Sequence, residues 1–69
     1  DLHGSINSYT QELKLNPQNT LTLIKRADLK KRIKDYQGAI EDYNKIIELK
    51  PDLVYAFVQR AGLKKCIRD

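Results

Sequence analysis

The sequence reads RADLKKRIKD at residues 26–35 and RAGLKKCIRD at residues 60–69. Nearly the same motif, rich in Lys and Arg, thus recurs after 34 residues. Seven of the ten positions carry identical residues. The same offset also aligns residues upstream of the motif: Asp1, Gly4, Ile6, Tyr9, Leu15 and Pro17 fall on Asp35, Gly38, Ile40, Tyr43, Leu49 and Pro51. A fixed period of this length indicates a repeat architecture, in which each period is one structural unit.

The period divides the chain into one complete copy and two partial copies. Residues 20–53 form the complete copy, residues 1–19 match the second half of a preceding copy, and residues 54–69 match the first half of a following copy. Because the chain begins with Asp1 and stops within a copy, we expect it to be a piece of a longer array. Its 69 residues leave room for a single domain.

Each half of the period has the apolar spacing of an amphipathic helix. Residues that cap or end helices set the boundaries: Asn19 or Thr20, Asp35 and Asp52 are natural N-caps, and Pro17 and Pro51 end the preceding helices. The sequence therefore predicts an all-α chain of four helices at about residues 3–15, 20–34, 36–50 and 54–68. Short connections make neighbouring helices antiparallel. The repeat favours an open stack of helix hairpins over the alternative, a closed four-helix bundle.

Small, aromatic and proline residues recur at fixed positions in the period. In the complete copy the diagnostic positions hold Leu23, Arg26, Ala27, Lys30, Ala39, Tyr43 and Pro51, and the partial copies supply Ser5, Tyr9, Pro17, Phe57 and Ala61. With the 34-residue period, this pattern resembles the tetratricopeptide repeat (TPR) family, whose signature is W-x2-L-G-x2-Y, A-x3-F and P. The resemblance covers essentially the whole chain. It implies a TPR-like α-solenoid that acts as a protein-interaction scaffold.

The chain departs from that signature where the family has Leu and Tyr in the first helix of each repeat. Arg26 and Lys30 occupy these positions, and Arg60 and Lys64 occupy them one period later. On a helical wheel the bases fall inside the apolar arc, and so do Asp42 and Glu12 on the second helices. One interpretation is a basic surface for phosphates. The other, which we favour, is that the aliphatic stems lie between helices and the charges pair internally; the predicted ion-pair set is Arg26, Lys30, Arg60 and Lys64 with Glu12 and Asp42.

The opposite face of the first helices mixes apolar and basic residues. The resemblance implies that this face lines a concave groove, with Ile24, Lys25, Asp28, Lys31, Arg32, Tyr55, Val58, Gln59 and Lys65 as candidate contacts. Leu21, Gly62 and Cys66 share this face. Such a groove suits an extended or helical peptide that carries acidic residues or a terminal carboxylate. We therefore expect a protein or peptide partner.

Two other functions compete with peptide binding. A net charge of +4 and an isoelectric point near 9.3 favour nucleic-acid binding through the basic helices. Self-association is the other alternative, because the first and last helices each lack a repeat neighbour and would expose apolar surface.

Catalytic, metal and membrane features are weak in this sequence. His3 stands alone, which makes a metal site improbable, and no carboxylate pair, Ser–His set or glycine-rich loop has a catalytic context. We therefore predict neither enzyme activity nor a cofactor. No run reaches the roughly 20 apolar residues of a membrane span. Cys66 is the only cysteine, which fits a reducing compartment and favours a cytoplasmic location.

Overall fold

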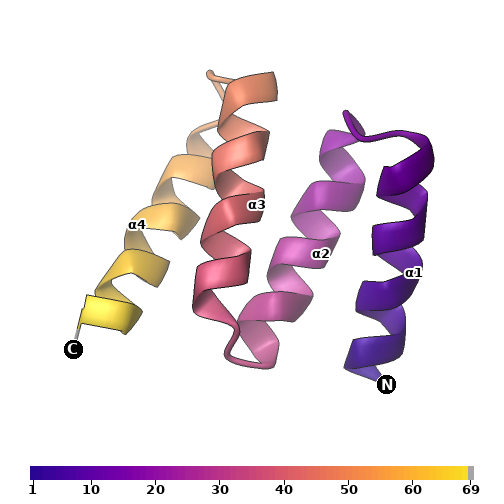
Figure 1. Cartoon of the computed structure of the whole chain (residues 1–69). Helices are drawn as coiled ribbons and strands as arrows, with labels where there is room; N and C mark the ends of the chain where they lie inside the picture. The colour runs from indigo at the N-terminus through magenta and orange to yellow at the C-terminus, as the bar shows by residue number, and fades with distance from the viewer. Residues whose placement is uncertain (69) are drawn as a thin grey trace.

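The computed structural model describes residues 1–68. Within that range the chain forms four helices and no strand: α1 (Leu2–Leu15), α2 (Thr20–Arg32), α3 (Tyr36–Leu49) and α4 (Val54–Arg68). Neighbouring helices run antiparallel in a row (Figure 1). The principal packing joins α1 to α2, α2 to α3 and α3 to α4. The predicted all-α class with four helices is thus confirmed, and α1 and α4 lie at opposite ends of the row rather than side by side as in a closed bundle.

Aspartate and asparagine side chains cap the N-termini of three of the helices. Asp1 accepts a hydrogen bond from the backbone N–H of His3, Asn19 from that of Thr22, and Asp35 from that of Gly38. Each bond satisfies a backbone donor that has no partner inside the helix. The predicted caps Asn19 and Asp35 are therefore confirmed.

The predicted cap Asp52 is wrong. Helix α4 begins at Val54, and Asp52 lies in the turn two residues earlier. The backbone carbonyl of Leu53 accepts a hydrogen bond of 3.1 Å from the N–H of Ala56, so Leu53 occupies the position before the helix. The turn has the same length as the one after Pro17, and Leu53 takes the position that the cap Asn19 has one period earlier, so Asp52 lies one residue too early to cap α4.

Helix α2 ends at Arg32, two residues before the predicted end. Lys34 has a φ of 67°, which is the left-handed region. The N–H of Lys34 donates to the carbonyl of Lys31 at 3.0 Å, and the N–H of Asp35 donates to that of Lys30 at 2.8 Å. This pair of bonds is a Schellman motif, which usually has glycine at the left-handed position. Because a lysine takes this position, the sequence does not indicate that the helix ends here.

The core lies along the three helix interfaces. Its buried apolar side chains are Leu13, Leu23, Ala27, Ala39, Ile40, Tyr43, Ile46, Ala56 and Leu63. Helix α3 supplies four of them because it has a neighbour on each side, α2 and α4. Ala27 and Ala39 are fully buried, so small side chains occupy the middle of the core on both α2 and α3. The core is therefore centred on α3.

Two helical glycines should respond differently to an added methyl group. A Cβ at Gly62 would meet no atom within 4 Å, whereas a Cβ at Gly38 would collide with the Asp35 carboxylate that caps α3. We expect Gly62→Ala to raise the free energy of unfolding by about 1 kcal/mol, the usual difference between alanine and glycine in a helix. Gly38→Ala should give no gain, because displacing the cap costs about 1 kcal/mol. Thermal unfolding of both variants measures the contrast, and equal stabilisation would contradict this account of the α3 cap.

Candidate functional site

A buried carboxylate joins α2 to α3. Asp42 accepts two hydrogen bonds from Arg26, from Nε at 2.9 Å and from Nη2 at 2.6 Å. The ammonium of Lys30 lies 3.6 Å from the same carboxylate. The Asp42 side chain is only 5% exposed, and those of Arg26 and Lys30 are 18% exposed. The hydrogen bonds and charge of Asp42 raise the pKa of Arg26 above its usual value, although burial acts against this. These bases are therefore held inside the helix layer, away from bulk solvent.

The arginines of the two motifs also contact the preceding helix, and they do so in the same way. Nη1 of Arg26 donates to Thr10 on α1 at 3.2 Å. One period later, Nη1 of Arg60 donates to Asn44 on α3 at 2.8 Å. Asn44 is 34 residues after Thr10, so both partners occupy the same position of the repeat. The 34-residue period of the sequence is thus reproduced in a side-chain contact.

The other members of the predicted ion-pair set, Glu12, Arg60 and Lys64, have no oppositely charged partner within residues 1–68. Glu12 is exposed and accepts a hydrogen bond of 3.3 Å from the Thr22 hydroxyl, which is neutral. The guanidinium of Arg60 lies over the ring of Phe57, with 5.6 Å to its centroid, and Lys64 is exposed.

The repeat explains why these ion pairs do not form. Glu12 aligns with Ile46 rather than with Asp42, so it is one turn away from the position that faces an arginine. For Arg60 and Lys64, the position one period after Asp42 lies beyond the sequence. The expected pairs of Glu12, Arg60 and Lys64 are therefore replaced by a neutral hydrogen bond, an aromatic contact and solvent.

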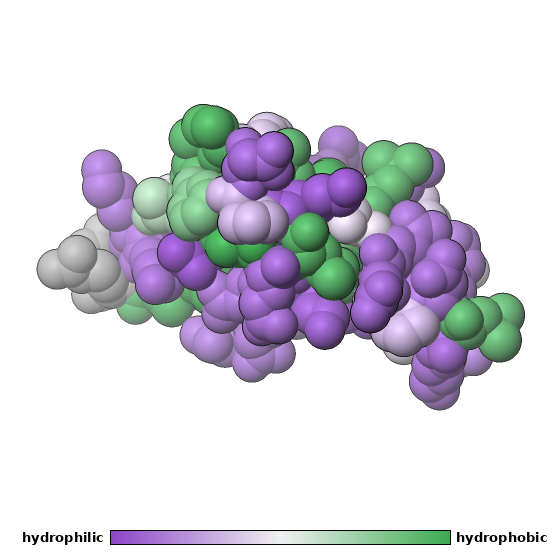
Figure 2. All heavy atoms as spheres, turned by 90° about the horizontal axis from the view of Figure 1, so that it is seen from above, coloured by the Kyte–Doolittle hydropathy of each residue, from purple (hydrophilic) through white to green (hydrophobic). Residues whose placement is uncertain are grey.

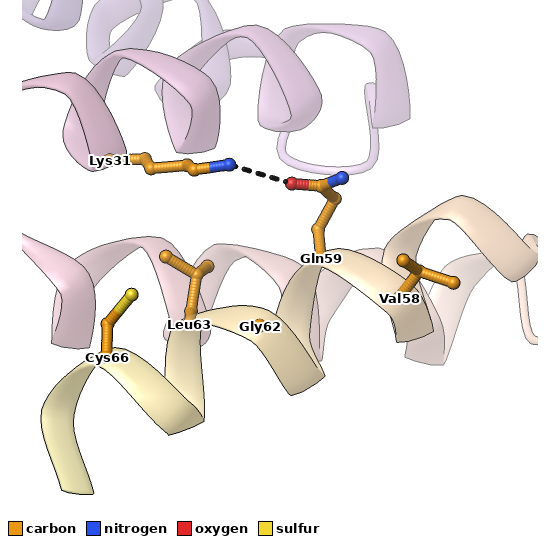
Figure 3. A pocket seen from close by; sticks show the side chains of 6 residues that line it. All are labelled: Lys31, Val58, Gln59, Gly62, Leu63 and Cys66. Atoms are coloured by element: carbon orange, nitrogen blue, oxygen red, sulfur yellow. Dashed lines mark hydrogen bonds between the residues drawn. The ribbon is translucent and has the colours of Figure 1, made fainter. Parts of the chain in front are cut away.

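A hollow of about 350 Å³ lies where α2 faces α4, and we call it the α2–α4 hollow. It is lined by Lys31, Val58, Gln59, Gly62, Leu63 and Cys66. The ammonium of Lys31 donates a hydrogen bond of 3.1 Å to the amide oxygen of Gln59, which spans the gap between the two helices (Figure 3). Leu63 is buried and gives the hollow an apolar base. The structure thus brings together three of the predicted groove residues, Lys31, Val58 and Gln59.

The remaining predicted groove residues do not line the hollow. Ile24 is half-buried and packs against the core. Asp28 and Arg32 form an exposed pair at 3.8 Å within α2. Tyr55 is exposed beside the core, and Lys25 and Lys65 are exposed. These six residues surround the core or face solvent, so the compact candidate site is smaller than the predicted groove.

Sequence reasoning missed Leu63 as a lining residue. Its repeat equivalent is Leu29, which falls at the edge of the apolar arc of the first helix. A leucine in that arc is predicted to be core, and Leu63 is indeed buried, but one side of it also forms the base of the hollow. The sequence did hold an indication that Leu63 lines the hollow as well as the core. Leu63 lies four residues after Gln59, so the two side chains are neighbours on one face of the helix.

The Tyr43 hydroxyl is buried and has no hydrogen-bond partner within residues 1–68. The ring of Tyr43 meets that of Tyr55 edge-on, with centroids 6.3 Å apart and an interplanar angle of 65°. Burial raises the pKa of Tyr43 well above its ordinary value, and the neighbouring Tyr55 raises it further. An unpaired hydroxyl therefore lies beneath the exposed Tyr55.

Metal and membrane features are absent from the described part of the chain. Residues 1–68 contain no group of three or more histidine, cysteine or acidic side chains placed to hold a metal ion. None of the described helices has both the length and the apolar character needed to cross a bilayer. Comparison with protein-family models found no match, and comparison with curated proteins found no significant relative.

Removal of the Asp42 carboxylate should be strongly destabilising. Asp42→Ala leaves Arg26 and Lys30 inside the helix layer without a counter-charge, which costs about 3–5 kcal/mol in comparable buried pairs. Asp28→Ala is the matched control, because it breaks the exposed pair with Arg32, where a loss of about 0–1 kcal/mol is normal. Urea unfolding of both variants measures the difference. A loss in Asp42→Ala no larger than that in Asp28→Ala would show that the buried cluster does not support the fold.

Tyr43 should make folding sensitive to alkaline pH. Its pKa is raised in the folded state, so above the ordinary tyrosine pKa of about 10 the unfolded chain releases a proton that the folded chain retains. Stability is therefore full below about pH 10 and falls as the pH rises further. We expect the wild type to lose more stability than Tyr43→Phe between about pH 9 and pH 11, measured by urea unfolding. Equal losses would contradict the raised pKa, since all other titrating groups are shared.

Proposed function

We propose that this chain is part of a TPR-type helical repeat scaffold that binds an acidic peptide segment in the α2–α4 hollow. The observation that carries the proposal is the hydrogen bond from Lys31 to Gln59 above the buried Leu63. It combines an ammonium, an amide and an apolar base in one concave place. These are the groups that fix the orientation of an extended peptide and bury one of its side chains.

Support for a stacked repeat comes from the contacts that recur with the sequence period. Arg26 and Arg60 reach back to equivalent positions on the preceding helix, and neighbouring helices are antiparallel. In a stack of repeats each unit makes the same contacts with the next, whereas a closed bundle has no such requirement. The period, the TPR-like motif and the repeated contact therefore favour the same architecture.

The hollow offers separate groups for the side chain and the backbone of a peptide. The ammonium of Lys31 makes one neutral hydrogen bond, to Gln59, and a carboxylate is a stronger acceptor for it. When a carboxylate takes Lys31, the amide of Gln59 is released to bond a peptide backbone group. Val58 is exposed at the edge of the hollow and provides an apolar contact. An acidic residue flanked by an apolar one fits this arrangement.

Nucleic-acid binding and self-association stay as alternatives. The structure reduces the basic surface available to phosphates, because Arg26 and Lys30 are already engaged by Asp42. Among the exposed large hydrophobic residues that the structure describes, Tyr55 and Phe57 alone are aromatic, so the remaining bases have few rings beside them on which nucleotide bases could stack. Peptide binding is therefore the function that the described geometry supports best.

A labelled acidic peptide tests the proposal. We would titrate a fluorescein-labelled ten-residue peptide of alternating Glu and Leu, and its Gln and Leu counterpart, into the protein and follow the anisotropy. The Glu peptide should bind more tightly than the Gln peptide. The double variant Lys31→Glu, Lys65→Glu should weaken the Glu peptide by about tenfold or more, which corresponds to about 1.4 kcal/mol, because it reverses charge at and beside the hollow.

A matched variant separates the hollow from overall charge. Lys14→Glu, Lys45→Glu makes the same change in net charge on α1 and α3, at exposed positions outside the hollow. Its effect on the Glu peptide should be much smaller than that of the first double variant. Equal weakening by both variants would mean that the peptide follows only the net charge, and the proposed site would be wrong.

A further inference from the structure

The hydroxyl of Tyr43 is buried without a hydrogen-bond partner within residues 1–68. Tyr43 is fully buried, so bulk water does not reach this side chain either. Leaving a buried polar group unpaired is unfavourable, and the great majority of buried polar groups in proteins have a partner. The hydroxyl is therefore an unused hydrogen-bonding group inside the row of helices.

Two exposed side chains from different helices flank this hydroxyl. The ring of Tyr55 on α4 meets the ring of Tyr43 edge-on, with 6.3 Å between the centroids, and Tyr55 is 45% exposed. Asp28 on α2 lies close enough for its charge to raise the pKa of Tyr43, after the larger effects of burial and of Tyr55. The Asp28 side chain is 47% exposed. We call Asp28, Tyr43 and Tyr55 together the Tyr43 site.

The Tyr43 site is open because of its position in the repeat. Leu21 is the repeat equivalent of Tyr55, and Leu21 is 61% exposed although α2 lies between α1 and α3. A helix that packed on α4 as α3 packs on α2 would therefore leave Tyr55 exposed too. Asp28 and Tyr43 lie on α2 and α3, each of which has a helix on both sides. The openness of the site is thus independent of where the row of helices ends.

The charge at the Tyr43 site favours a cation. Within residues 1–68 the ionic contact of Asp28 is the pair with Arg32 at 3.8 Å, and so exposed a pair is weak. The negative charge of Asp42 also acts on the Tyr43 hydroxyl. The ring face of Tyr55 attracts cations, and the Tyr43 oxygen has lone pairs that accept a hydrogen bond. An anion at this place would meet like charge instead.

The chain binds its own arginine side chains with the same two kinds of contact. Arg26 donates two hydrogen bonds to the carboxylate of Asp42. Arg60 lies over the ring of Phe57. A guanidinium is planar and has five N–H donors, so it can bond a carboxylate and a hydroxyl oxygen while it lies against a ring. The ammonium of lysine is a compact point charge and fits such a set of groups less well.

We propose that the Tyr43 site binds the guanidinium of an arginine in the same peptide whose acidic residue binds in the α2–α4 hollow. The guanidinium bonds the Asp28 carboxylate and the Tyr43 oxygen. Tyr55 turns aside to admit it, since side chains this exposed change rotamer within nanoseconds. The inference rests on the proposed function, because it assigns a second residue of that peptide.

The spacing of the two sites predicts the spacing of the peptide residues. Lys31 follows Asp28 by three residues on α2, and Gln59 follows Tyr55 by four on α4. These separations place side chains about 5–6 Å apart on a helix surface. In an extended peptide, side chains two residues apart point the same way and lie about 6.6 Å apart. The matching peptide therefore has an arginine and a glutamate separated by one residue.

An apolar residue suits the position between the two charges. From above, hydrophobic side chains stand in separate groups among hydrophilic ones (Figure 2). A peptide that alternates charged and apolar residues meets both kinds of group.

Three ten-residue peptides test the inference. The first alternates Glu and Leu, and the others carry arginine or its neutral analogue citrulline at the fifth position. Each is labelled with fluorescein and titrated into the protein. Because the net charge of the protein is +4, overall charge alone favours the citrulline peptide. We expect the arginine peptide to bind about tenfold more tightly than the citrulline peptide, because citrulline lacks the charge that the site bonds.

Two substitutions remove the groups of the Tyr43 site one at a time. Tyr43→Phe removes the hydroxyl alone, and Asp28→Asn removes the charge. Each should reduce the preference for arginine over citrulline severalfold. Tyr9→Phe and Asp52→Asn are the matched controls on α1 and in the turn before α4, and both should keep the preference. Because the Tyr43 hydroxyl is unpaired in the free protein, Tyr43→Phe should not lower the melting temperature.

The peptide of Glu and Leu separates failure of the inference from failure of the proposed function. If it binds, and the arginine and citrulline peptides bind equally tightly, the Tyr43 site is wrong while the hollow remains supported. A lower melting temperature of Tyr43→Phe would show that the hydroxyl is already paired, and this too would overturn the inference.

If none of the peptides binds, the proposed function is wrong and a smaller probe decides on the Tyr43 site. N-acetylarginine amide and N-acetylcitrulline amide are titrated into isotope-labelled protein, and the amide chemical shifts are followed. Shift changes at Asp28 and Tyr55 with the arginine compound alone would support the site. Identical spectra with the two compounds would overturn it.

Discussion

The Asp42 carboxylate is the constraint on which the arrangement of the helices depends. It is nearly buried, and the bidentate hydrogen bonds from Arg26 and the charge of Lys30 compensate it. Apolar burial is non-directional and would tolerate several positions of α3 along α2. A slide of one turn would take Asp42 away from both bases and leave charges buried without partners, which is far more unfavourable. The ion cluster therefore fixes the register of the two central helices, while Ala27 and Ala39 keep the space between them small.

The same interaction explains why Arg26 and Lys30 lie in the apolar arc of α2. A base there is unfavourable unless the facing helix brings an acid, and α3 does so for α2. The motif in α4 keeps the bases although no described helix brings the acid to them. Arg60 instead donates a hydrogen bond to Asn44 and lies over the ring of Phe57.

Local sequence patterns were sufficient to predict the helices. They did not predict contacts that depend on which residues of other helices lie nearby. The four helices, the caps Asn19 and Asp35 and the proximity of Arg26 to Asp42 all follow from the period and from helical spacing. The end of α2 did not, because Lys34 takes a left-handed conformation that the sequence does not indicate. The predicted ion pair of Glu12 was wrong because a helical wheel gives the angle of a residue around the helix axis. It does not give the position along the axis at which the partner residue lies. The bond from Lys31 to Gln59 was equally hidden, since it depends on the distance between two helices that are not chain neighbours.

The α2–α4 hollow borders α4, and this has a physical consequence for that helix. Helix α4 packs principally on α3, so fewer contacts hold it than hold α2 or α3. A ligand that contacted Lys31 of α2 and Gln59 of α4 together would add a link between two helices that are not chain neighbours. Because such a ligand would bind only the folded arrangement, it would stabilise the position of α4 by mass action.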